Sequence, residues 1–301
     1  MSLHRLAHLP TPTWPVALQQ HPVFAAALGY LGIEQRCLGW ADPGNDGAVL
    51  VMRRRFGPFR LDVASRAHLP QMAAQDLAHW RTGGIGAFSI TPETNTQITG
   101  SLPVATPAHV AEWDLTQAPN ARRAALSGAF RTALRKAESG AIKTRAFVPS
   151  RDSLLTTLAC DAAQQRRKGF RALPAHLVLA CHTVKPAALL LFQAYQKHNV
   201  LAEVLVIMHP PAATYHLGWT SPEGRNAQAM NLLLWQAANM LADRGVERFD
   251  LGLVATDRSP GLARFKLSTG ARVRPLGPTR FIGPLTGVLS RFARQTPCAT
   301  A

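Results

Sequence analysis

The spacing of hydrophobic and polar positions along the chain predicts helices alternating with short strands. Residues 69–81 form an amphipathic helical pattern that Gly83 and Gly84 close, and residues 226–244 form a longer one that ends before Gly245. Short apolar runs next to turn residues are typical of strands. Helices are expected at 23–31, 69–81, 121–139, 153–167, 226–244 and 261–267. Strands are expected at 48–53, 59–63, 87–90, 109–115, 141–147, 201–208, 213–219, 248–251 and from 271 to 275.

Two further apolar stretches, 175–180 and 187–194, fit a helix or a strand equally well. The predicted elements fall into two blocks of mixed strand and helix, which meet near residue 115. No sequence repeat relates the two blocks, although folds recur without sequence identity. The pattern therefore predicts an α/β protein of two domains, residues 1–115 and residues 116–301.

Composition places the chain among globular proteins, because 47% of its 301 residues are hydrophobic and 17% are charged. The longest apolar stretches are too short to span a bilayer, and the first residues show no apolar core of a secretory leader. The four cysteines are scattered without the spacing of a zinc site or a disulfide framework. We expect a reduced, cytoplasmic protein with no metal site.

The formal net charge of +16 indicates an anionic partner, such as RNA, a phosphorylated substrate, an acidic carrier protein or a peripheral membrane contact. An arginine-rich genome would also raise the basic residues throughout the chain. The segment 122–171 nevertheless holds twelve basic and three acidic residues, a net of +9 out of +16. A general bias does not predict this clustering.

The last hundred residues carry the most specific pattern of the chain. Its parts, in order, are Tyr-x-x-Gly-x-Thr from Tyr215, Leu-x-Trp-x-Ala from Leu233, Gly-Val-x-x-Phe-Asp-Leu-Gly from Gly245, Gly-Leu-x-x-Phe-Lys from Gly261, and Gly270. This order and spacing resemble the Fem-type branch of the GCN5-related N-acetyltransferase (GNAT) superfamily. That branch includes aminoacyl-tRNA-dependent enzymes that build peptidoglycan cross-bridges. The resemblance weakens toward the N-terminus and implies two tandem GNAT-like domains, each with a mixed central sheet flanked by helices.

The resemblance also implies roles for four residues in this pattern. Lys266 and Phe265 would be catalytic, with Lys266 stabilising the carbonyl oxygen of the attacked ester and Phe265 forming a packing wall. A surface lysine and a core phenylalanine are the structural alternatives. Tyr215 would contact the acceptor substrate, or pair with a neighbouring strand. Asp250 would orient Lys266 or the substrate amine, or cap the turn at Gly252.

Basic residues upstream resemble the family's anion-binding positions. Arg167 and Arg171 would face a phosphorylated acceptor, because an arginine fork matches phosphate geometry. A second group would bind tRNA or another anion: Arg131, Arg135, Lys136, Arg166 and Lys168. A solvated basic face is an equally good interpretation of both groups.

The sequence lacks a motif that would indicate coenzyme A as the carrier of the transferred acyl group. Ordinary acetyltransferases hold the coenzyme A pyrophosphate with (Gln/Arg)-x-x-Gly-x-(Gly/Ala) at a helix start. In residues 225–230, Gln228 and Met230 occupy the two small-residue positions, which argues against a standard acyl-CoA site. The leading hypothesis is an aminoacyltransferase that needs no cofactor and moves an aminoacyl group from tRNA onto an amine.

The amine acceptor would be a small molecule, a peptide or a cell-wall precursor. The chain lacks the coiled-coil insertion frequent in the cross-bridge enzymes, so the cell-wall precursor is not favoured over the others. Two alternatives stay open. One is an N-acyltransferase that uses acyl-CoA or acyl carrier protein, and the other is a non-catalytic RNA-binding protein on a GNAT-like fold.

Overall fold

The computed structural model describes residues 3–40, 47–77, 86–168, 173–257, 259–283 and residue 286. The chain divides into two compact units. The first contains Met1–Thr11, Gln19–Ala108 and the segment that begins at Pro275, and the second contains Pro12–Leu18 and His109–Arg274. These units differ from the predicted domains of 1–115 and 116–301, because residues 109–115 join the second unit and the chain after Pro275 returns to the first.

The first unit is built on a seven-stranded mixed sheet with the strand order β1-β2-β3-β4-β5-β14-β6. Only β4 and β5 pair in parallel, and the other neighbours are antiparallel. The strands are β1 (His4–Leu6), β2 (Gln35–Trp40), β3 (Gly47–Phe56), β4 (Phe59–Ala67), β5 (Gly86–Pro92), β6 (Leu102–Ala105) and β14 (Thr279–Ile282). The helical elements are η1 (Leu18–Gln20), α1 (Pro22–Tyr30) and α2 (Gln71–Leu77).

Helix α1 begins as its sequence predicts. His21 Nδ1 accepts a hydrogen bond from the Val23 amide at 3.2 Å, and Pro22 occupies the first turn, where a missing N–H costs nothing. On the sheet, Leu38, Val49, Val51 and Ile90 form part of one buried apolar cluster. This cluster supplies the core on which the first unit folds.

The second unit holds another seven-stranded mixed sheet, in the order β13-β7-β12-β11-β10-β9-β8. Its strands are β7 (His109–Asp114), β8 (Lys143–Phe147), β9 (Leu189–Gln196), β10 (Asn199–His209), β11 (Ala212–Thr220), β12 (Arg248–Leu253) and β13 (Arg272–Pro275). Its helical elements are α3 (Pro119–Ala125), α4 (Gly128–Glu138), α5 (Arg151–Lys168), α6 (Ala175–Val184), η2 (Pro186–Ala188), α7 (Pro222–Asn226), α8 (Ala229–Asp243) and α9 (Pro260–Ser268).

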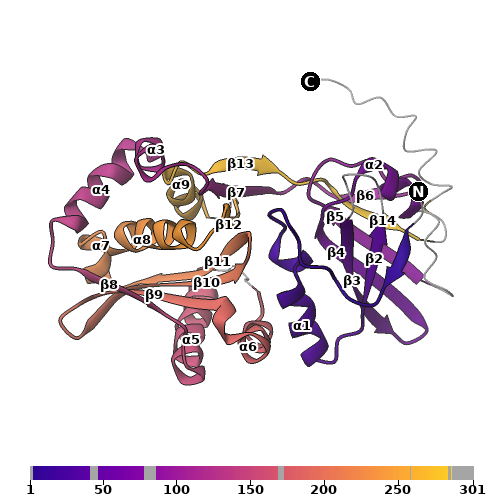
Figure 1. The fold of residues 1–301 in the computed structure, drawn as a ribbon, viewed down its shortest axis with the longest axis horizontal. Helices are drawn as coiled ribbons and strands as arrows, with labels where there is room; N and C mark the ends of the chain where they lie inside the picture. Colours follow the sequence, from indigo (N-terminus) through magenta and orange to yellow (C-terminus); the bar gives the residue numbers. More distant parts are fainter. Residues whose placement is uncertain are drawn as a thin grey trace. The chain divides into compact units, whose positions relative to one another are not determined.

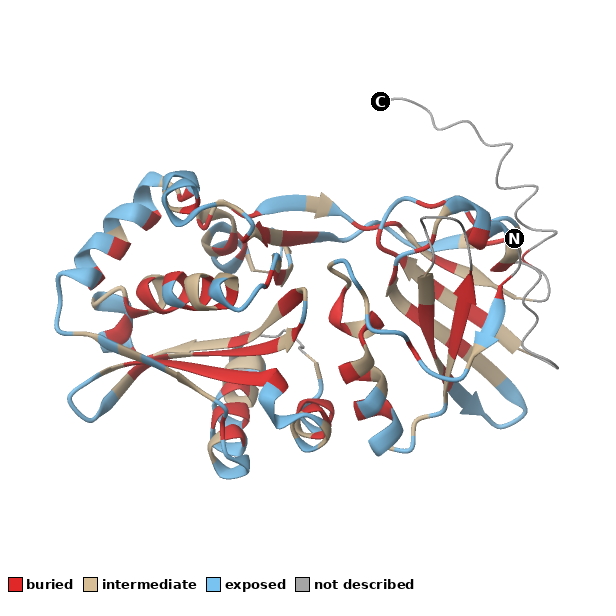
Figure 2. Cartoon of the chain, in the orientation of Figure 1, coloured by how far each residue is buried: buried red, intermediate tan, exposed pale blue. Residues whose placement is uncertain are grey.

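Helices cover both faces of this second sheet (Figure 1). Helices α3, α4, α8 and α9 lie on one face, and α5 and α6 lie on the other. The core of the first face joins Leu134 of α4, Leu233 and Ala237 of α8, and the strand residues Val204 and Phe249. Figure 2 shows the corresponding bands of buried residues along α8 and the central strands. The α/β class with two mixed sheets flanked by helices is thus confirmed.

Several elements differ from the sequence expectations. The helix expected at 121–139 is two helices, because Ser127 interrupts it and caps α4 by accepting from the Phe130 amide at 3.2 Å. The helix expected at 226–244 is α7 followed by α8. The two ambiguous stretches resolve into helix α6 and strand β9. Strands β1, β2, β6 and β14 were not anticipated. Strands β1, β6 and β14 are short and pair with strands distant in sequence, whereas β2 pairs with the adjacent β3.

Candidate active site

Two neighbouring parallel strands separate in the middle of the second sheet, and the candidate site lies where they part. Strand β11 pairs with β12 only over Ala212–Thr214 and Arg248–Asp250. Beyond this point β11 continues beside β10 as far as Thr220, whereas β12 continues beside β7 as far as Leu253. The strand ends that follow the separation carry Tyr215 on one side and Gly252 on the other.

Lys266 lies on α9 beside the end of β12. Its side chain is buried, with 7% of the residue exposed, and Nζ donates a hydrogen bond to the Leu253 carbonyl at 2.8 Å. Burial lowers the pKa of Lys266 to about 8, and the nearby Asp250 carboxylate opposes part of that shift. The predicted surface-lysine alternative is therefore wrong, and the structure holds an ammonium group in a dry place.

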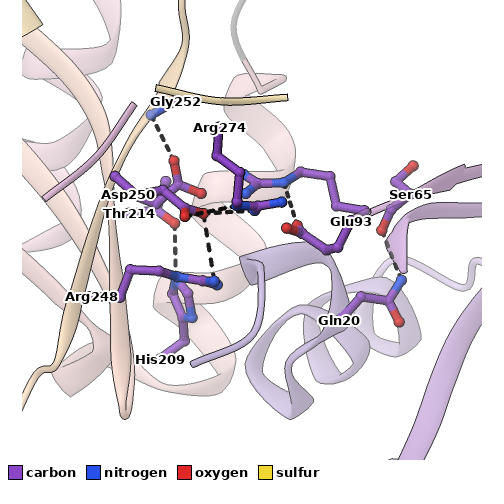
Figure 3. A network of polar contacts seen from close by, with 11 residues as sticks. Gln20, Ser65, Glu93, His209, Thr214, Arg248, Asp250, Gly252 and Arg274 are labelled. Atoms are coloured by element: carbon purple, nitrogen blue, oxygen red, sulfur yellow. Dashed lines mark hydrogen bonds and ion pairs between the residues drawn. The ribbon is translucent and has the colours of Figure 1, made fainter. Parts of the chain in front are cut away.

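Asp250 is fully buried and shapes the turn that follows it. Its Oδ1 accepts a hydrogen bond from the Gly252 amide at 2.7 Å (Figure 3). Gly252 has φ of +78°, a left-handed conformation that strains other residues, and a Cβ there would lie 3.7 Å from Lys266 Nζ. Asp250 thus caps the turn, as one of the predicted alternatives has it, and its charge acts on Lys266. The predicted role of Asp250 in orienting Lys266 or a substrate amine stays a prediction.

Glu112 of β7 forms ion pairs with the strands on both sides of it, β12 and β13. Glu112 of β7 accepts from Arg274 of β13 through Nε at 2.9 Å and Nη2 at 2.8 Å. Arg248 of β12 lies 3.5 Å from the same carboxylate. Figure 3 shows Arg248, Asp250 and Arg274 gathered at this part of the sheet. The strand that leads to Gly252 is therefore fixed by both packing and charge.

Tyr215 packs against the α8 side of the sheet, and its hydroxyl lies over Gly218. A Cβ at Gly218 would meet that hydroxyl at 1.9 Å, so only glycine leaves room for this rotamer. Burial, with a contribution from the Asp161 carboxylate, raises the pKa of Tyr215 well above its usual range. Tyr215 is a neutral hydroxyl beside the separation of β11 and β12, and its predicted contact with the acceptor stays a prediction.

His216 is a residue of this region that the sequence did not single out. The register of β10 against β11 shifts between Leu205 and Val206, whose partners are Leu217 and Tyr215, so His216 is the extra residue of a β-bulge. Its Nε2 is buried and has no hydrogen-bond partner among the described residues. Burial lowers the pKa of His216 to about 4, so the ring is neutral at physiological pH. The sequence gives no local signal for a bulge at this position.

Phe265 precedes Lys266 and faces the helical layer. Its ring lies 6.0 Å from that of Phe130 on α4, with 31° between the ring planes. The contact holds α9 against α4 and so sets the position of the lysine that follows. Phe265 thus packs against the hydrophobic core, and its predicted roles as a packing wall of the site and in catalysis stay predictions.

The predicted anion-binding residues do not form one surface. Arg131, Arg135 and Lys136 are exposed on α4, whereas the exposed Arg166 lies on α5, on the other face of the sheet (Figure 1). The side chains of Arg167 and Lys168 lie outside the described part of the chain, as does all of Arg171. Any role of these three residues stays a prediction.

Several basic residues of the segment 122–171 have structural partners instead. Arg122 is buried and donates to the carbonyls of Leu115 and Gln117 at 2.8 and 3.0 Å. Arg131 also donates to backbone carbonyls, among them that of Ala124 at 2.8 Å. In contrast, the side chains of Lys136 and Arg166 form no hydrogen bond or ion pair with other described residues. Part of the charge cluster therefore serves the fold.

The start of α8 is where ordinary acetyltransferases carry their glycine-containing pyrophosphate motif, which this sequence lacks. Helix α7 runs almost directly into α8, and Gln228, between them, has the left-handed φ of 58°. The amides of Ala227 and Gln228 donate to the carbonyls of Glu223 and Arg225 at 2.9 and 3.1 Å. Two amides that could otherwise face a pyrophosphate are thus already used.

Comparison with known proteins agrees with this architecture. Residues 124–267 match the family model of the acetyltransferase (GNAT) domain. The structure of FemX is similar with a TM-score of 0.72 at 12% identity, covering 92% of this chain and 96% of that one. No curated protein matches the sequence.

Two further solved structures share the fold. The C-terminal domain of a protein from Agrobacterium fabrum described as a lysylphosphatidylglycerol synthetase has a TM-score of 0.52 at 13% identity, with 91% of each chain covered. L-PGS from Bacillus licheniformis has a TM-score of 0.51 at 13% identity, covering 92% of this chain and 94% of that one.

Residues 124–267 therefore form a GNAT-fold acetyltransferase domain, and this domain supports an acyltransferase. The Fem-type resemblance is confirmed at the level of the fold, which extends over nearly the whole chain. Among the described helices, none is long and apolar enough to cross a membrane.

Proposed function

We propose that this protein forms an amide bond by moving an aminoacyl group from aminoacyl-tRNA to an amine acceptor. The observation that carries the proposal is Lys266, a buried ammonium held 2.8 Å from the Leu253 carbonyl beside the separation of β11 and β12. A fixed positive charge in a dry site stabilises a developing oxyanion far better than one in water. The Fem-type resemblance supplies the class of donor.

The reaction needs no covalent enzyme intermediate. The acceptor nitrogen attacks the ester carbonyl carbon, a C–N bond forms, and the carbonyl oxygen becomes an oxyanion that Lys266 would stabilise. The ester C–O bond then breaks and the terminal ribose oxygen of the tRNA leaves. One proton passes overall from the amine to that ribose oxygen. With a pKa of about 8, Lys266 is mainly protonated at neutral pH, as this role requires.

The start of α8 supports tRNA over coenzyme A as the donor carrier. Backbone amides at a helix start bind pyrophosphate when glycines expose them. Here Ala227 and Gln228 have already donated their amides to α7, and side chains rather than hydrogens occupy the positions of Gln228 and Met230. Such a helix start offers a poor cradle for coenzyme A.

Surface charge supports the same donor. Lys136 on α4 is exposed and its side chain has no partner among the described residues, and Arg135 beside it is exposed as well. Exposed cations on a helix face suit the phosphate backbone of a nucleic acid. A second candidate is N-acylation from acyl-CoA or acyl carrier protein, which the acetyltransferase description of the matched domain favours.

One experiment separates the two donors. The full chain is incubated with total tRNA charged with radiolabelled amino acids, or with labelled acetyl-CoA, together with the low-molecular-mass amines of a cell extract. We expect label to reach an amine from the charged tRNA, and RNase treatment before the incubation to abolish the transfer. Transfer from acetyl-CoA that RNase leaves unchanged would replace the tRNA proposal by the second candidate.

Binding is tested separately by retention of total tRNA at increasing salt. We expect affinity to fall steeply with salt, and Lys136→Gln to reduce the salt dependence. Lys185→Gln is the matched control, because Lys185 is an exposed lysine at the end of α6, on the opposite face of the sheet. Retention that does not weaken with salt would contradict a phosphate contact.

A further inference from the structure

The hairpin of β3 and β4 in the first unit has an unusual tip. The sequence from Arg53 reads Arg-Arg-Arg-Phe-Gly-Pro-Phe-Arg, so four apolar or small residues stand between arginines. Phe56 pairs with Phe59 across the turn, and Arg55 pairs with Arg60 directly behind them. Gly57 has φ of +59°, which a two-residue hairpin turn requires and glycine adopts without strain.

This hairpin extends beyond the strands on either side of it. Strand β2 pairs with β3 only over Gly47–Met52, and β5 pairs with β4 only from Arg60 onward. Residues 54–59 therefore form a two-stranded ribbon without a lateral partner among the described strands. A Cβ built at Gly57 meets no atom within 4 Å, so open space surrounds the turn.

Both aromatic rings at the tip face solvent. Phe56 is 61% exposed and Phe59 is 57% exposed, among the highest values of any large hydrophobic residue in the described chain. Figure 2 shows this end of the hairpin as exposed. Single exposed hydrophobic residues are ordinary. Two paired phenylalanines on a projecting turn are less common, and their unfavourable exposure to water would be removed by contact with an apolar partner.

The charge behind the rings is positive. Arg54 is exposed and forms no hydrogen bond or ion pair with another described residue, and Arg55 lies directly opposite Arg60. Arg55 forms an ion pair with Glu34 at 2.8 Å, but the side chain of Arg55 remains 59% exposed. The exposed side chains of Arg54 and Arg55 therefore give the base of the tip a positive charge that suits an anionic partner.

We propose that the tip of this hairpin, residues 54–60, docks the protein on an anionic lipid bilayer. The rings of Phe56 and Phe59 would enter the boundary between headgroups and acyl chains, and the arginines behind them would meet lipid phosphates. This contact is independent of the proposed reaction, because every residue that carries it belongs to the first unit.

A bilayer fits these observations better than RNA does. Single-stranded nucleic acid is bound in a charged groove, where bases stack on aromatic rings along the path of the backbone. This hairpin instead presents a projecting turn whose foremost four residues are all uncharged and exposed. Apolar residues in front of a row of cations match the layered polarity of a membrane surface.

The test is co-flotation of the full chain with vesicles of phosphatidylcholine alone or with 30% phosphatidylglycerol (roughly the anionic content that attracts basic segments). We expect binding to the anionic vesicles, and binding that weakens as salt rises. The double variant Phe56→Ser/Phe59→Ser should bind on the order of tenfold more weakly. Arg54→Gln should bind about fivefold more weakly, from the loss of one charge near the surface.

Tyr30→Ser is the matched control, because Tyr30 is an aromatic residue equally exposed at 61% on another element of the first unit. It should bind vesicles as the wild type does. Circular dichroism checks that each variant is folded, and the single variants Phe56→Ser and Phe59→Ser replace a double variant that is not.

Three results would overturn the proposal. The first is a wild-type chain that ignores the anionic vesicles, and the second is undiminished binding by the folded Phe56 and Phe59 variants. The third is a double variant that keeps vesicle binding but loses retention of total tRNA, which would assign the hairpin to RNA.

Discussion

Lys266 allows the sharpest prediction, because the same side chain should lower stability and promote catalysis. Its pKa falls from an ordinary 10.5 to about 8 through burial, and that difference corresponds to about 3 kcal/mol against the charged form. The hydrogen bond to the Leu253 carbonyl returns about 1 kcal/mol. Lys266→Met should therefore raise the free energy of unfolding at pH 7 by about 2 kcal/mol.

The pH dependence follows from the sign of the shift. The folded-state pKa lies below the unfolded value, so the unfolded chain binds more protons between about pH 8 and pH 10.5. Wild-type stability should rise with pH across this window relative to the methionine variant, and the full penalty is present below about pH 8. Urea unfolding of both proteins at several pH values measures the difference. Lys185→Met, at an exposed lysine, is the control.

The same substitution that raises stability, Lys266→Met, should lower the rate of transfer. Loss of one donor to an oxyanion costs roughly 10²- to 10³-fold in kcat, so Lys266→Met should lose about that much transfer from charged tRNA. Wild-type transfer should decline above about pH 8 as the ammonium deprotonates, and Lys266→Arg should remove that decline. A methionine variant within threefold of the wild-type rate would refute the role of Lys266 as an oxyanion stabiliser, and unchanged stability would refute its burial as a charge.

Three further substitutions are tested by urea unfolding. Two of them test the packing beside the site, and the third tests a buried ion pair in the first unit. Gly218→Ala should cost about 1–3 kcal/mol, because its Cβ would meet the Tyr215 hydroxyl at 1.9 Å, and Tyr215→Phe in the same chain should recover part of that loss; an unaffected alanine variant would show that Tyr215 moves freely. His216→Phe should stabilise the chain by about 1–2 kcal/mol, since it removes a buried Nε2 that no described residue contacts through a hydrogen bond; destabilisation would mean that the ring has a partner in solution. Asp62→Asn should cost about 3–5 kcal/mol, because it leaves the buried Arg53 without the carboxylate 2.7 Å from its Nε; a cost below about 1 kcal/mol would contradict the burial of that pair.

The sequence by itself determined much of the second unit. Strands β10, β11 and β12 and helix α9 follow from local apolar runs and from nearby turn residues, so their order and approximate bounds could be predicted. The spacing from Tyr215 to Lys266 indicated the family, and the family indicated the class of enzyme. The absence of glycine at Gln228 and Met230 was equally visible, because it depends only on residue type.

Only the tertiary structure decided how distant segments combine. Strand β14 closes the first sheet against β5 and β6, a pairing nearly 200 residues apart in sequence that no local pattern encodes. The burial of Arg122 and the separation of Arg135 from Arg166 on opposite faces of one sheet likewise depend on packing. The local sequence indicates the type of most elements, whereas burial and hydrogen bonding across the whole chain decide their partners and the type of ambiguous stretches such as α6 and β9. The dry surroundings that set the pKa of Lys266 are a product of that packing.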